Sequence, residues 1–195
     1  GTSRTVNVPG RGEVQYYAQN DPVWAAMRYE ARKSKQARPF GQGGCGPTNM
    51  AMAIANLVPE ESLCGISAYA RVENGYTFCT CSVNQYFCNH RHAQYKLETP
   101  AEFRRYLPLA IASFATGNNI WGETSRGDGG GTNTAFMKRV TEAYGLYFTL
   151  TKDRELALSA LADGAMVIAS TGGKASPFTG GGHYLTLASV YEGRL

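Results

Sequence analysis

The chain has 195 residues, of which 43% are hydrophobic and 17% charged, and its formal net charge is +4. This length is enough for one domain with a sizeable core, so we expect a single domain over residues 1–195. The composition excludes a disordered chain, and no run of about 18 apolar residues is present to span a membrane. The basic residues of 28–38 are interrupted by others, so we expect a solvated face and no nucleic-acid partner.

In chain order, the first regular pattern is the alternation of EVQYYAQ, residues 13–19, which predicts a short strand. The Asn-Asp-Pro sequence of residues 20–22 then predicts a turn. The most clearly marked helix follows Cys45 and reaches Leu57. Pro47 suits its first turn, where a missing N–H costs nothing, and apolar residues then recur at helical spacing.

Start and stop signals predict three more helices in the second half of the chain. Thr99-Pro100 opens the first, in TPAEFRRYLPLA. An amphipathic helix is predicted over residues 132–145, ended by a glycine, and Asp153 can cap another that Gly164 ends.

Strands are predicted over residues 146–151, 165–170 and 183–191. Residues 122–131 and 172–182 are predicted to be glycine-rich loops. Residues 77–98 follow neither the helical nor the strand period, and we expect them to form an insertion between helices.

Cys45 lies between glycines at the start of its predicted helix. The unpaired N–H groups and the positive dipole end of a helix N-terminus stabilise a thiolate, which is the nucleophilic form of cysteine. Gly43, Gly44 and Gly46 are expected to let a substrate backbone approach and to free N–H groups for an oxyanion hole. The pattern favours a nucleophile, and a buried structural cysteine is the alternative.

A thiolate nucleophile needs a base, and the chain has three histidines: His90, His92 and His183. His183 follows three glycines and begins an alternating apolar strand, on which it points to the same face as Leu185 and Leu187. A histidine fixed at the mouth of a core strand and flanked by glycine suits a general base. The alternative is a core histidine at a strand end.

Several segments taken together resemble one family. The chain contains QNDPVW (19–24), GCGPTNMAMAIA (44–55), GGGTNTAFMKRVTEAYGL (129–146) and GGHYLTLASVYEGR (181–194). In this order they resemble the papain-like bacterial cysteine peptidases of the bacteriocin-processing type. The resemblance implies an α+β papain-like fold, in which a helix carrying the nucleophile packs on an antiparallel sheet carrying the histidine. It also implies that Cys45 attacks an amide carbonyl, with His183 as base, through an acyl-enzyme.

The resemblance further implies a glutamine side chain in the oxyanion hole and an Asp or Asn after the histidine that orients the imidazole. For the glutamine, Gln19 is preferred over Gln42. For the orienting residue, either the strand that would carry it is missing after Leu195, or a residue elsewhere substitutes. The candidates for such a substitute are Asn118, Asn119, Asp128 and Glu192.

The remaining cysteines concentrate around the predicted insertion. Cys79, Cys81, Cys88, His90 and His92 form the pattern C-x-C-x6-C-x-H-x-H, and Cys64 precedes it. A structural zinc held by Cys79, Cys81, Cys88 and His90 is one interpretation, although the spacing matches no common zinc knuckle.

Disulfides are preferred over zinc, and free thiols are the third alternative. A bridge between Cys79 and Cys81 would be strained. The open pairings are therefore Cys64–Cys79 with Cys81–Cys88, or Cys64–Cys81 with Cys79–Cys88. Two bridges would be compatible with an exported protein, so we expect a secreted or cell-envelope location.

The leading functional prediction is a monomeric cysteine peptidase or amidase, a hydrolase with no cofactor. Its substrate would be a peptide or protein, including a cell-wall peptide. An acyltransferase of transglutaminase-like type would use the same dyad with an amine as acceptor. A binding or adhesion module with a degenerate site is the prediction from a different class of protein.

Overall fold

The computed structural model describes residues 1–26, 28–29, 38–68, 76–79, 94–97, 99–117, 132–172 and 182–195. Side chains are described within these ranges except at 28–29, 38, 65–68, 76–79, 94–97 and 113–117. In the first half of the chain the elements are β1 (Arg4–Val8), β2 (Gly12–Tyr16), β3 (Arg28–Tyr29), β4 (Arg38–Pro39), α1 (Phe40–Gly43), α2 (Cys45–Leu57), the 3-10 helix η1 (Glu60–Ala68) and β5 (Tyr76–Cys79). The second half has β6 (Gln94–Leu97), α3 (Pro100–Arg105), α4 (Leu107–Gly117), α6 (Thr134–Ala143), α7 (Arg154–Ala162), β7 (Val167–Thr171) and β8 (His183–Leu187).

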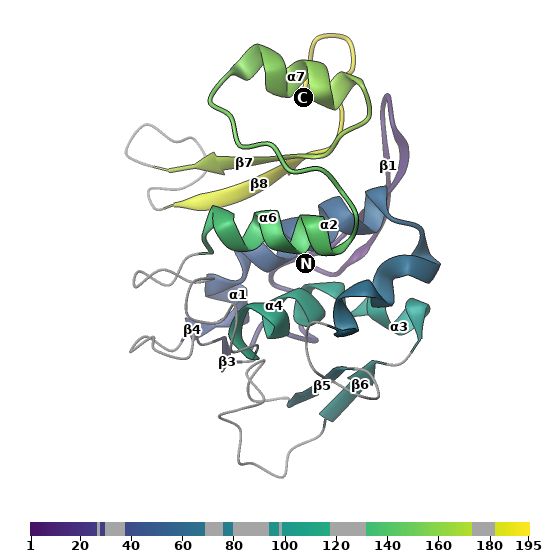
Figure 1. The fold of residues 1–195 in the computed structure, drawn as a ribbon, viewed down its shortest axis with the longest axis vertical. Helices are drawn as coiled ribbons and strands as arrows, with labels where there is room; N and C mark the ends of the chain where they lie inside the picture. The colour runs from purple at the N-terminus through teal and green to yellow at the C-terminus, as the bar shows by residue number, and fades with distance from the viewer. Residues whose placement is uncertain are drawn as a thin grey trace.

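The architecture is a mixture of helices and antiparallel strand pairs, which agrees with the α+β prediction. Strands pair as β1–β2, β3–β4, β5–β6 and β7–β8, and every pairing within the described residues is antiparallel. Figure 1 shows α7 on one side of the β7–β8 pair and α2 with α6 on the other. Helices α3 and α4 lie beyond α2, and the β5–β6 pair lies at the far end.

Helix α2 is the centre of the fold, because almost every residue of its first three turns is buried. Met50, Ala51 and Ile54 belong to the main hydrophobic core, together with Phe103 and Leu107 from the α3–α4 region. A helix that is apolar all round has no face suited to water and therefore packs between other elements. Helix α2 accordingly contacts α4, β8, β2 and α6.

The helix predicted from Thr99 is correct at its start but is interrupted. The Thr99 side chain accepts a hydrogen bond from the Glu102 N–H, and the Glu102 carboxylate accepts one from the Thr99 N–H, forming a capping box. Helix α3 ends at Arg105 with Tyr106 as its C-cap, and α4 then begins with Pro108 in its first turn. Proline has no N–H to continue the first helix and its ring excludes the carbonyl four residues earlier, which explains the break.

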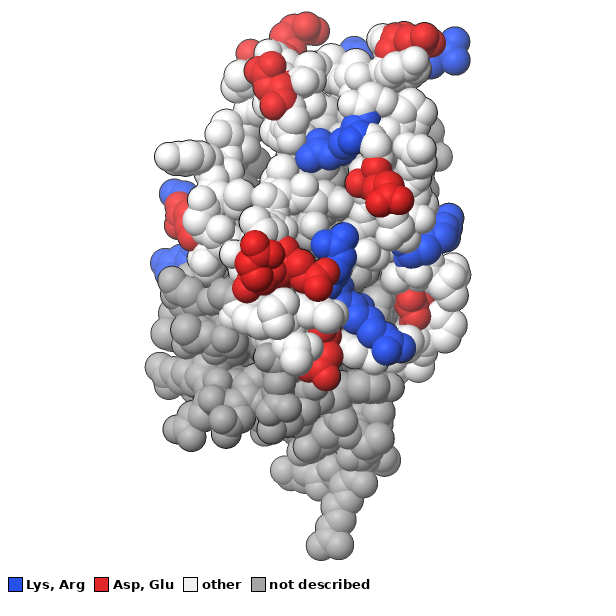
Figure 2. Space-filling model, turned by 90° about the vertical axis from the view of Figure 1, so that its right-hand side faces the viewer, with Lys and Arg blue, Asp and Glu red and all other residues white. Residues whose placement is uncertain are grey.

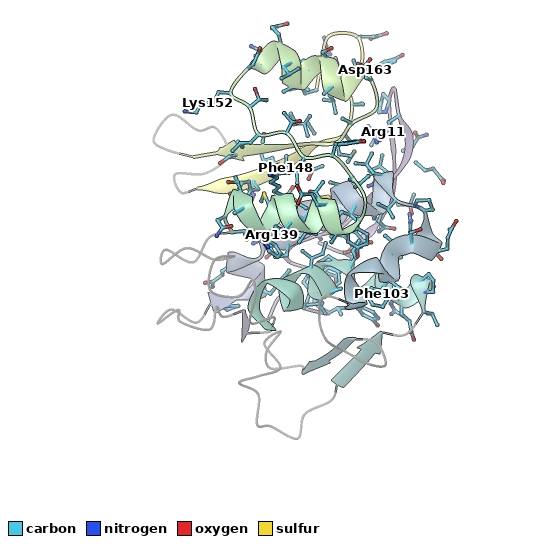
Figure 3. All side chains as sticks on the ribbon, in the orientation of Figure 1. Arg11, Phe103, Arg139, Phe148, Lys152 and Asp163 are labelled. Carbon is cyan, nitrogen blue, oxygen red and sulfur yellow. The ribbon has the colours of Figure 1, made fainter. Side chains whose placement is uncertain are left out.

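The N-terminal hairpin is fastened to the C-terminal part of the chain by Arg11. The Arg11 guanidinium donates hydrogen bonds to the carbonyls of Gly164, Ala165 and Ala188 at 3.0 to 3.1 Å. The Ser189 hydroxyl also donates to the Pro9 carbonyl at 2.7 Å. Figure 3 shows Arg11 reaching from the hairpin toward this region. Strands β1 and β2 are thereby held beside the end of β8.

The helices around the β7–β8 pair have side-chain caps at their starts, and the cap at Asp153 was predicted. Asn133 caps α6 by accepting from the Phe136 N–H, and Asp153 caps α7 by accepting from the N–H groups of Glu155 and Leu156. Gly145, after α6, has φ of +73°, a conformation that favours glycine.

The strand predicted over residues 146–151 is wrong. This segment contains neither strand nor helix, and no backbone hydrogen bond joins residues 147–150 to another described residue. Its alternation reflects half-burial: Phe148 packs against the core between α6 and β8 (Figure 3), whereas Tyr147 is fully exposed. A period of two marks a segment with one buried side, but a strand also requires a neighbour with which to pair.

The predicted strands at 13–19, 165–170 and 183–191 are present but shorter or shifted, as β2, β7 and β8. The two ends of the segment predicted as an insertion at 77–98 form the β5–β6 pair, in which Cys79 is opposite Gln94. Cys81, Cys88, His90 and His92 lie outside the described residues, as do the side chain of Cys79 and most of the predicted glycine-rich loops.

Charged side chains on the described surface are of mixed sign. Figure 2 shows acidic and basic side chains interspersed over the described part of one face, rather than gathered into a basic patch. Within the described residues, no helix combines the length and apolar character needed to cross a membrane.

Candidate active site

Cys45 is the first residue of α2 and is half-buried. The glycines on either side of it have a different role from the one predicted. A side chain at Gly44 would lie 2.7 Å from the ring of Phe40, and one at Gly46 would lie 2.1 Å from the Thr132 hydroxyl oxygen. These glycines therefore allow the protein's own side chains to pack against the start of α2, and the expectation that they admit a substrate backbone is wrong for both.

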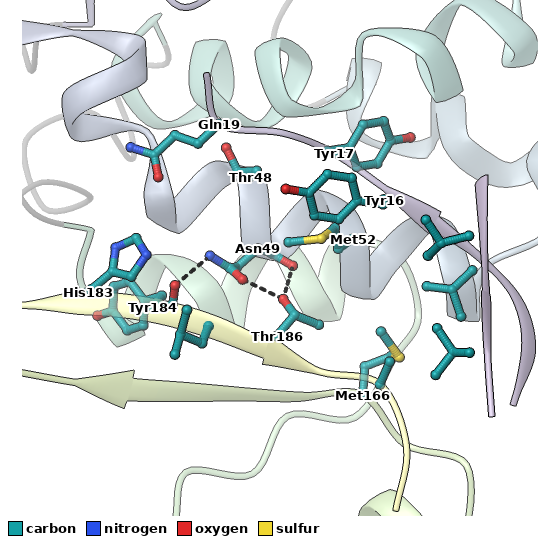
Figure 4. Close-up of a pocket in the computed structure, with 15 residues that line it drawn as sticks. Tyr16, Tyr17, Gln19, Thr48, Asn49, Met52, Met166, His183, Tyr184 and Thr186 are labelled. Carbon is teal, nitrogen blue, oxygen red and sulfur yellow. Dashed lines mark hydrogen bonds between the residues drawn. The ribbon is translucent and has the colours of Figure 1, made fainter. Parts of the chain in front are cut away.

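Asn49, one turn after Cys45, joins α2 to β8. Its amide nitrogen donates to the Cys45 carbonyl at 2.8 Å and to the Tyr184 carbonyl at 2.9 Å, and its amide oxygen accepts from the Thr186 hydroxyl at 2.5 Å. Figure 4 shows the bonds to the strand. We call this set of bonds the Asn49 clamp. A single nitrogen atom thus connects the candidate nucleophile's residue with the residue that follows His183.

Asn56, two turns further along the helix, joins α2 to β2. Its amide nitrogen donates to the Met52 carbonyl at 2.7 Å and to the Gln15 carbonyl at 3.0 Å, and its oxygen accepts from the Gln15 N–H at 2.8 Å. We call this set the Asn56 clamp. Because the two asparagines are seven residues apart, they lie on the same side of the helix and fix two different strands to it.

A cavity of about 290 Å³ lies between the strands that these clamps hold. Its floor is formed by Thr48, Asn49 and Met52 of α2, with β1 and β2 on one side and β8 on the other. Residues three, four and seven positions after a helical residue share its face, so Cys45 is on the side of α2 that carries Thr48, Asn49 and Met52, although it is not among the residues that line the cavity.

His183 and Gln19 both line this cavity. Figure 4 shows them at one end, with Met166 at the other. The Gln19 amide nitrogen donates to the Gly41 carbonyl at 2.9 Å, which fixes the side chain beside α1, the short helix that precedes Cys45. A primary amide has two N–H donors, so one is left to face a ligand.

The turn that carries Gln19 is held on both sides. The Trp24 indole donates to the Ala18 carbonyl at 3.0 Å, and its ring meets Phe40 edge-on. The Asp21 carboxylate accepts from the N–H groups of Ser3 and Val23 at 2.8 and 3.0 Å. Burial raises the pKa of Asp21, but these hydrogen bonds outweigh it and leave the pKa below its usual value.

Tyr184, next to His183, connects β8 with the start of α6. Its hydroxyl donates to the Thr132 carbonyl at 2.7 Å. Burial raises the pKa of Tyr184, and the charge of Cys45 raises it further. The Thr132 hydroxyl is buried against Gly46, and no hydrogen-bond partner for it is found among the described residues.

Of the predicted residues, His183 and Gln19 line the same cavity, and Cys45 begins the helix that forms its floor. The other candidates lie elsewhere or outside the described residues. Gln42 is exposed on α1. Glu192 is exposed and follows the end of β8 opposite to His183. Asn118, Asn119 and Asp128 lie outside the described residues.

Sequence reasoning missed Asn49, Asn56, Thr132 and Tyr184. The signal available for the asparagines was their place in an apolar helix, where buried amides need partners from outside the helix. Nothing in the sequence, however, indicated which strand would supply them.

A metal site receives no support from the described part of the chain. There, no group of three or more His, Cys, Asp or Glu side chains is arranged to hold a metal ion. Of the predicted zinc ligands, Cys81, Cys88 and His90 lie outside the described residues, and so does the side chain of Cys79.

The chain was compared with models of protein families, with curated proteins and with solved structures, and none of these comparisons finds a match.

Proposed function

We propose that this protein is a cysteine peptidase or amidase of papain-like fold that cleaves a peptide or amide bond through an acyl-enzyme. The Asn49 clamp carries the proposal, because it fixes the residue of the candidate nucleophile against the strand that begins with His183. The position of His183 and Gln19 in one cavity adds a base and an oxyanion donor within the same region.

In the proposed reaction, His183 takes the proton of the Cys45 thiol, and the sulfur attacks the substrate carbonyl carbon. The carbonyl oxygen becomes an oxyanion, to which the remaining N–H of Gln19 donates. Collapse of this intermediate breaks the C–N bond, and His183 gives its proton to the leaving amine. Water, activated by His183, then hydrolyses the thioester and regenerates the thiol.

The proposed substrate is a peptide or protein, including a cell-wall peptide, and the proposed location is secreted or at the cell envelope. We propose a monomer that works without a cofactor.

Alkylation of the cysteines tests the dyad directly. The protein is treated with iodoacetamide at pH 6, and labelling at each cysteine is followed by peptide mapping. Cys45 is expected to react at least about tenfold faster than the free thiol of N-acetylcysteine under the same conditions, because a thiolate is the reacting form and an ordinary thiol is almost fully protonated at about pH 6.

His183→Ala is expected to lower the rate of Cys45 to that of N-acetylcysteine or below. A Cys45 that reacts no faster than N-acetylcysteine in the wild-type protein would contradict the proposal. Cleavage of a peptide library, with Cys45→Ala as the inactive control, then establishes hydrolysis. Products that contain an added amine would instead identify acyl transfer.

A further inference from the structure

The candidate site continues into an apolar compartment that the reaction itself does not use. Beyond His183 and Gln19, the walls of the cavity are formed mainly by aliphatic and thioether side chains: Val6, Val8, Val14, Met52, Met166 and Ala188. No Asp, Glu, Lys or Arg is among the described residues that line it. A cavity with one polar end and one apolar end suits a ligand whose polar group reacts and whose apolar group is buried.

We propose that this compartment binds an aliphatic side chain of the substrate, of the size of Leu, Ile or Met, beside the bond that is cleaved. This inference rests on the proposed function, since it assigns the polar end of the cavity to the reacting amide. A charged side chain would lose its hydration here and find no countercharge, whereas an aliphatic one gains from burial.

The size and construction of the cavity support this occupant. At about 290 Å³ it lies at the lower limit of ordinary ligand sites, which suits a side chain rather than a lipid. Met52 comes from α2 and Met166 precedes β7, so an adaptable thioether lies on each side.

The two clamps explain why the compartment is open. Protein interiors normally close over a gap of this size. Here, the Asn49 clamp fixes α2 to β8 and the Asn56 clamp fixes it to β2, so neither strand can move over Met52 without breaking hydrogen bonds. The compartment is therefore prepared before a ligand arrives.

Binding to the inactive protein tests the inference without relying on catalysis. Cys45→Ala is titrated with N-acetyl-leucinamide, N-acetyl-glycinamide and N-acetyl-aspartamide, and binding is followed by NMR. We expect the leucine compound to bind at least about tenfold more tightly than the glycine compound, and the aspartate compound to bind most weakly.

Met52→Lys, in the same background, is expected to abolish the preference for leucine. Leu57→Lys is the matched control, because it also replaces an apolar residue by lysine, at an exposed position of the same helix that does not line the cavity. Met52→Leu should retain the preference. If Met52→Lys does not fold, Met166→Gln tests the other side of the compartment in the same way.

Equal binding of the leucine and glycine compounds would overturn the inference. So would a leucine preference that survives both Met52→Lys and Met166→Gln. Failure of the proposed function is recognised separately, because Cys45 would then be unreactive. In that case a leucine preference in Cys45→Ala that is lost in Met52→Lys would still locate the aliphatic site. For an active enzyme, kcat/KM should follow the same order among peptides that vary beside the cleaved bond.

Discussion

The two ends of α2 are fixed by the same device with different consequences. At each clamp, an asparagine amide nitrogen donates to the carbonyl four residues earlier and to a strand carbonyl. Asn56 receives its third bond from the backbone of Gln15, whereas Asn49 receives it from the side chain of Thr186. The Asn49 clamp also has His183 beside it, on the strand that it holds. The comparison shows that two similar sets of hydrogen bonds differ in their relation to the candidate site only through the residues that lie beside each of them.

The largest expected difference between the clamps is in activity. Asn49→Ala should lower kcat/KM by about 10²-fold, because a shift of about 1 Å between nucleophile and base costs that much. Asn56→Ala should leave kcat/KM within a few-fold of wild type. The measurement is steady-state cleavage of a peptide, supported by the rate of Cys45 alkylation.

The free energy of unfolding of each variant shows whether a loss of activity comes from a change in the relative position of Cys45 and His183 or from damage to the fold. Each variant loses one clamp and leaves buried backbone groups unpaired, so both should lower the free energy of unfolding by a similar amount, about 2 kcal/mol. Equal losses of activity in the two variants would show that Asn49 has no special relation to the site. Asn49→Asp, which keeps the shape but cannot donate, should resemble Asn49→Ala.

A second prediction concerns the start of α2, where Gly46 is in contact with Thr132. The end of the helix at Asn56 has no such contact in this comparison. Gly46→Ala places a methyl group on the Thr132 side chain and should lower the free energy of unfolding by about 2 kcal/mol, measured by urea denaturation. Much of this loss should disappear when Thr132→Gly is combined with it, because the two residues are in direct contact. Additive losses would contradict the contact.

A smaller effect is expected at Thr132 itself. Its hydroxyl is buried without a partner among the described residues, and Thr132→Val keeps the shape while removing the polar atom. The free energy of unfolding should therefore rise by about 1 kcal/mol. Thr141→Val is the control: the Thr141 hydroxyl donates to the Met137 carbonyl at 2.7 Å, so the same change there should not stabilise the protein. A lower stability of Thr132→Val would show that the hydroxyl has a partner in solution.

The smallest expected effect concerns Asp21, whose carboxylate holds the turn that carries Gln19. Unlike the amides of the two clamps, this carboxylate titrates. The pKa of Asp21 is lower in the folded protein than usual, so its contribution to stability is present above about pH 4 and lost as the pH falls through the folded value. The difference in unfolding free energy between wild type and Asp21→Asn should accordingly shrink on acidification. The same comparison with Asn56→Ala, which involves no titrating group, should not change. A constant difference for Asp21→Asn would contradict the prediction.

Local signals were sufficient for several elements and insufficient for others. The helix after Cys45 and the cap at Asp153 depend on neighbouring residues, and they were predicted correctly. The strand at 146–151 was predicted wrongly, because pairing depends on a distant partner that the segment lacks among the described residues.

The sequence by itself determined which residues were chemically equipped for the site: a cysteine at a helix start, a histidine at a strand start and a glutamine before a turn. It also determined the caps and the glycine stops, since these act within a few residues. Only the tertiary structure decided that Asn49 and Asn56 would fix β8 and β2 to one helix, and that Gly44 and Gly46 would admit Phe40 and Thr132. The reason is physical: a buried amide must find partners and a glycine leaves space, but which distant residue provides the partner or fills the space depends on how the chain packs.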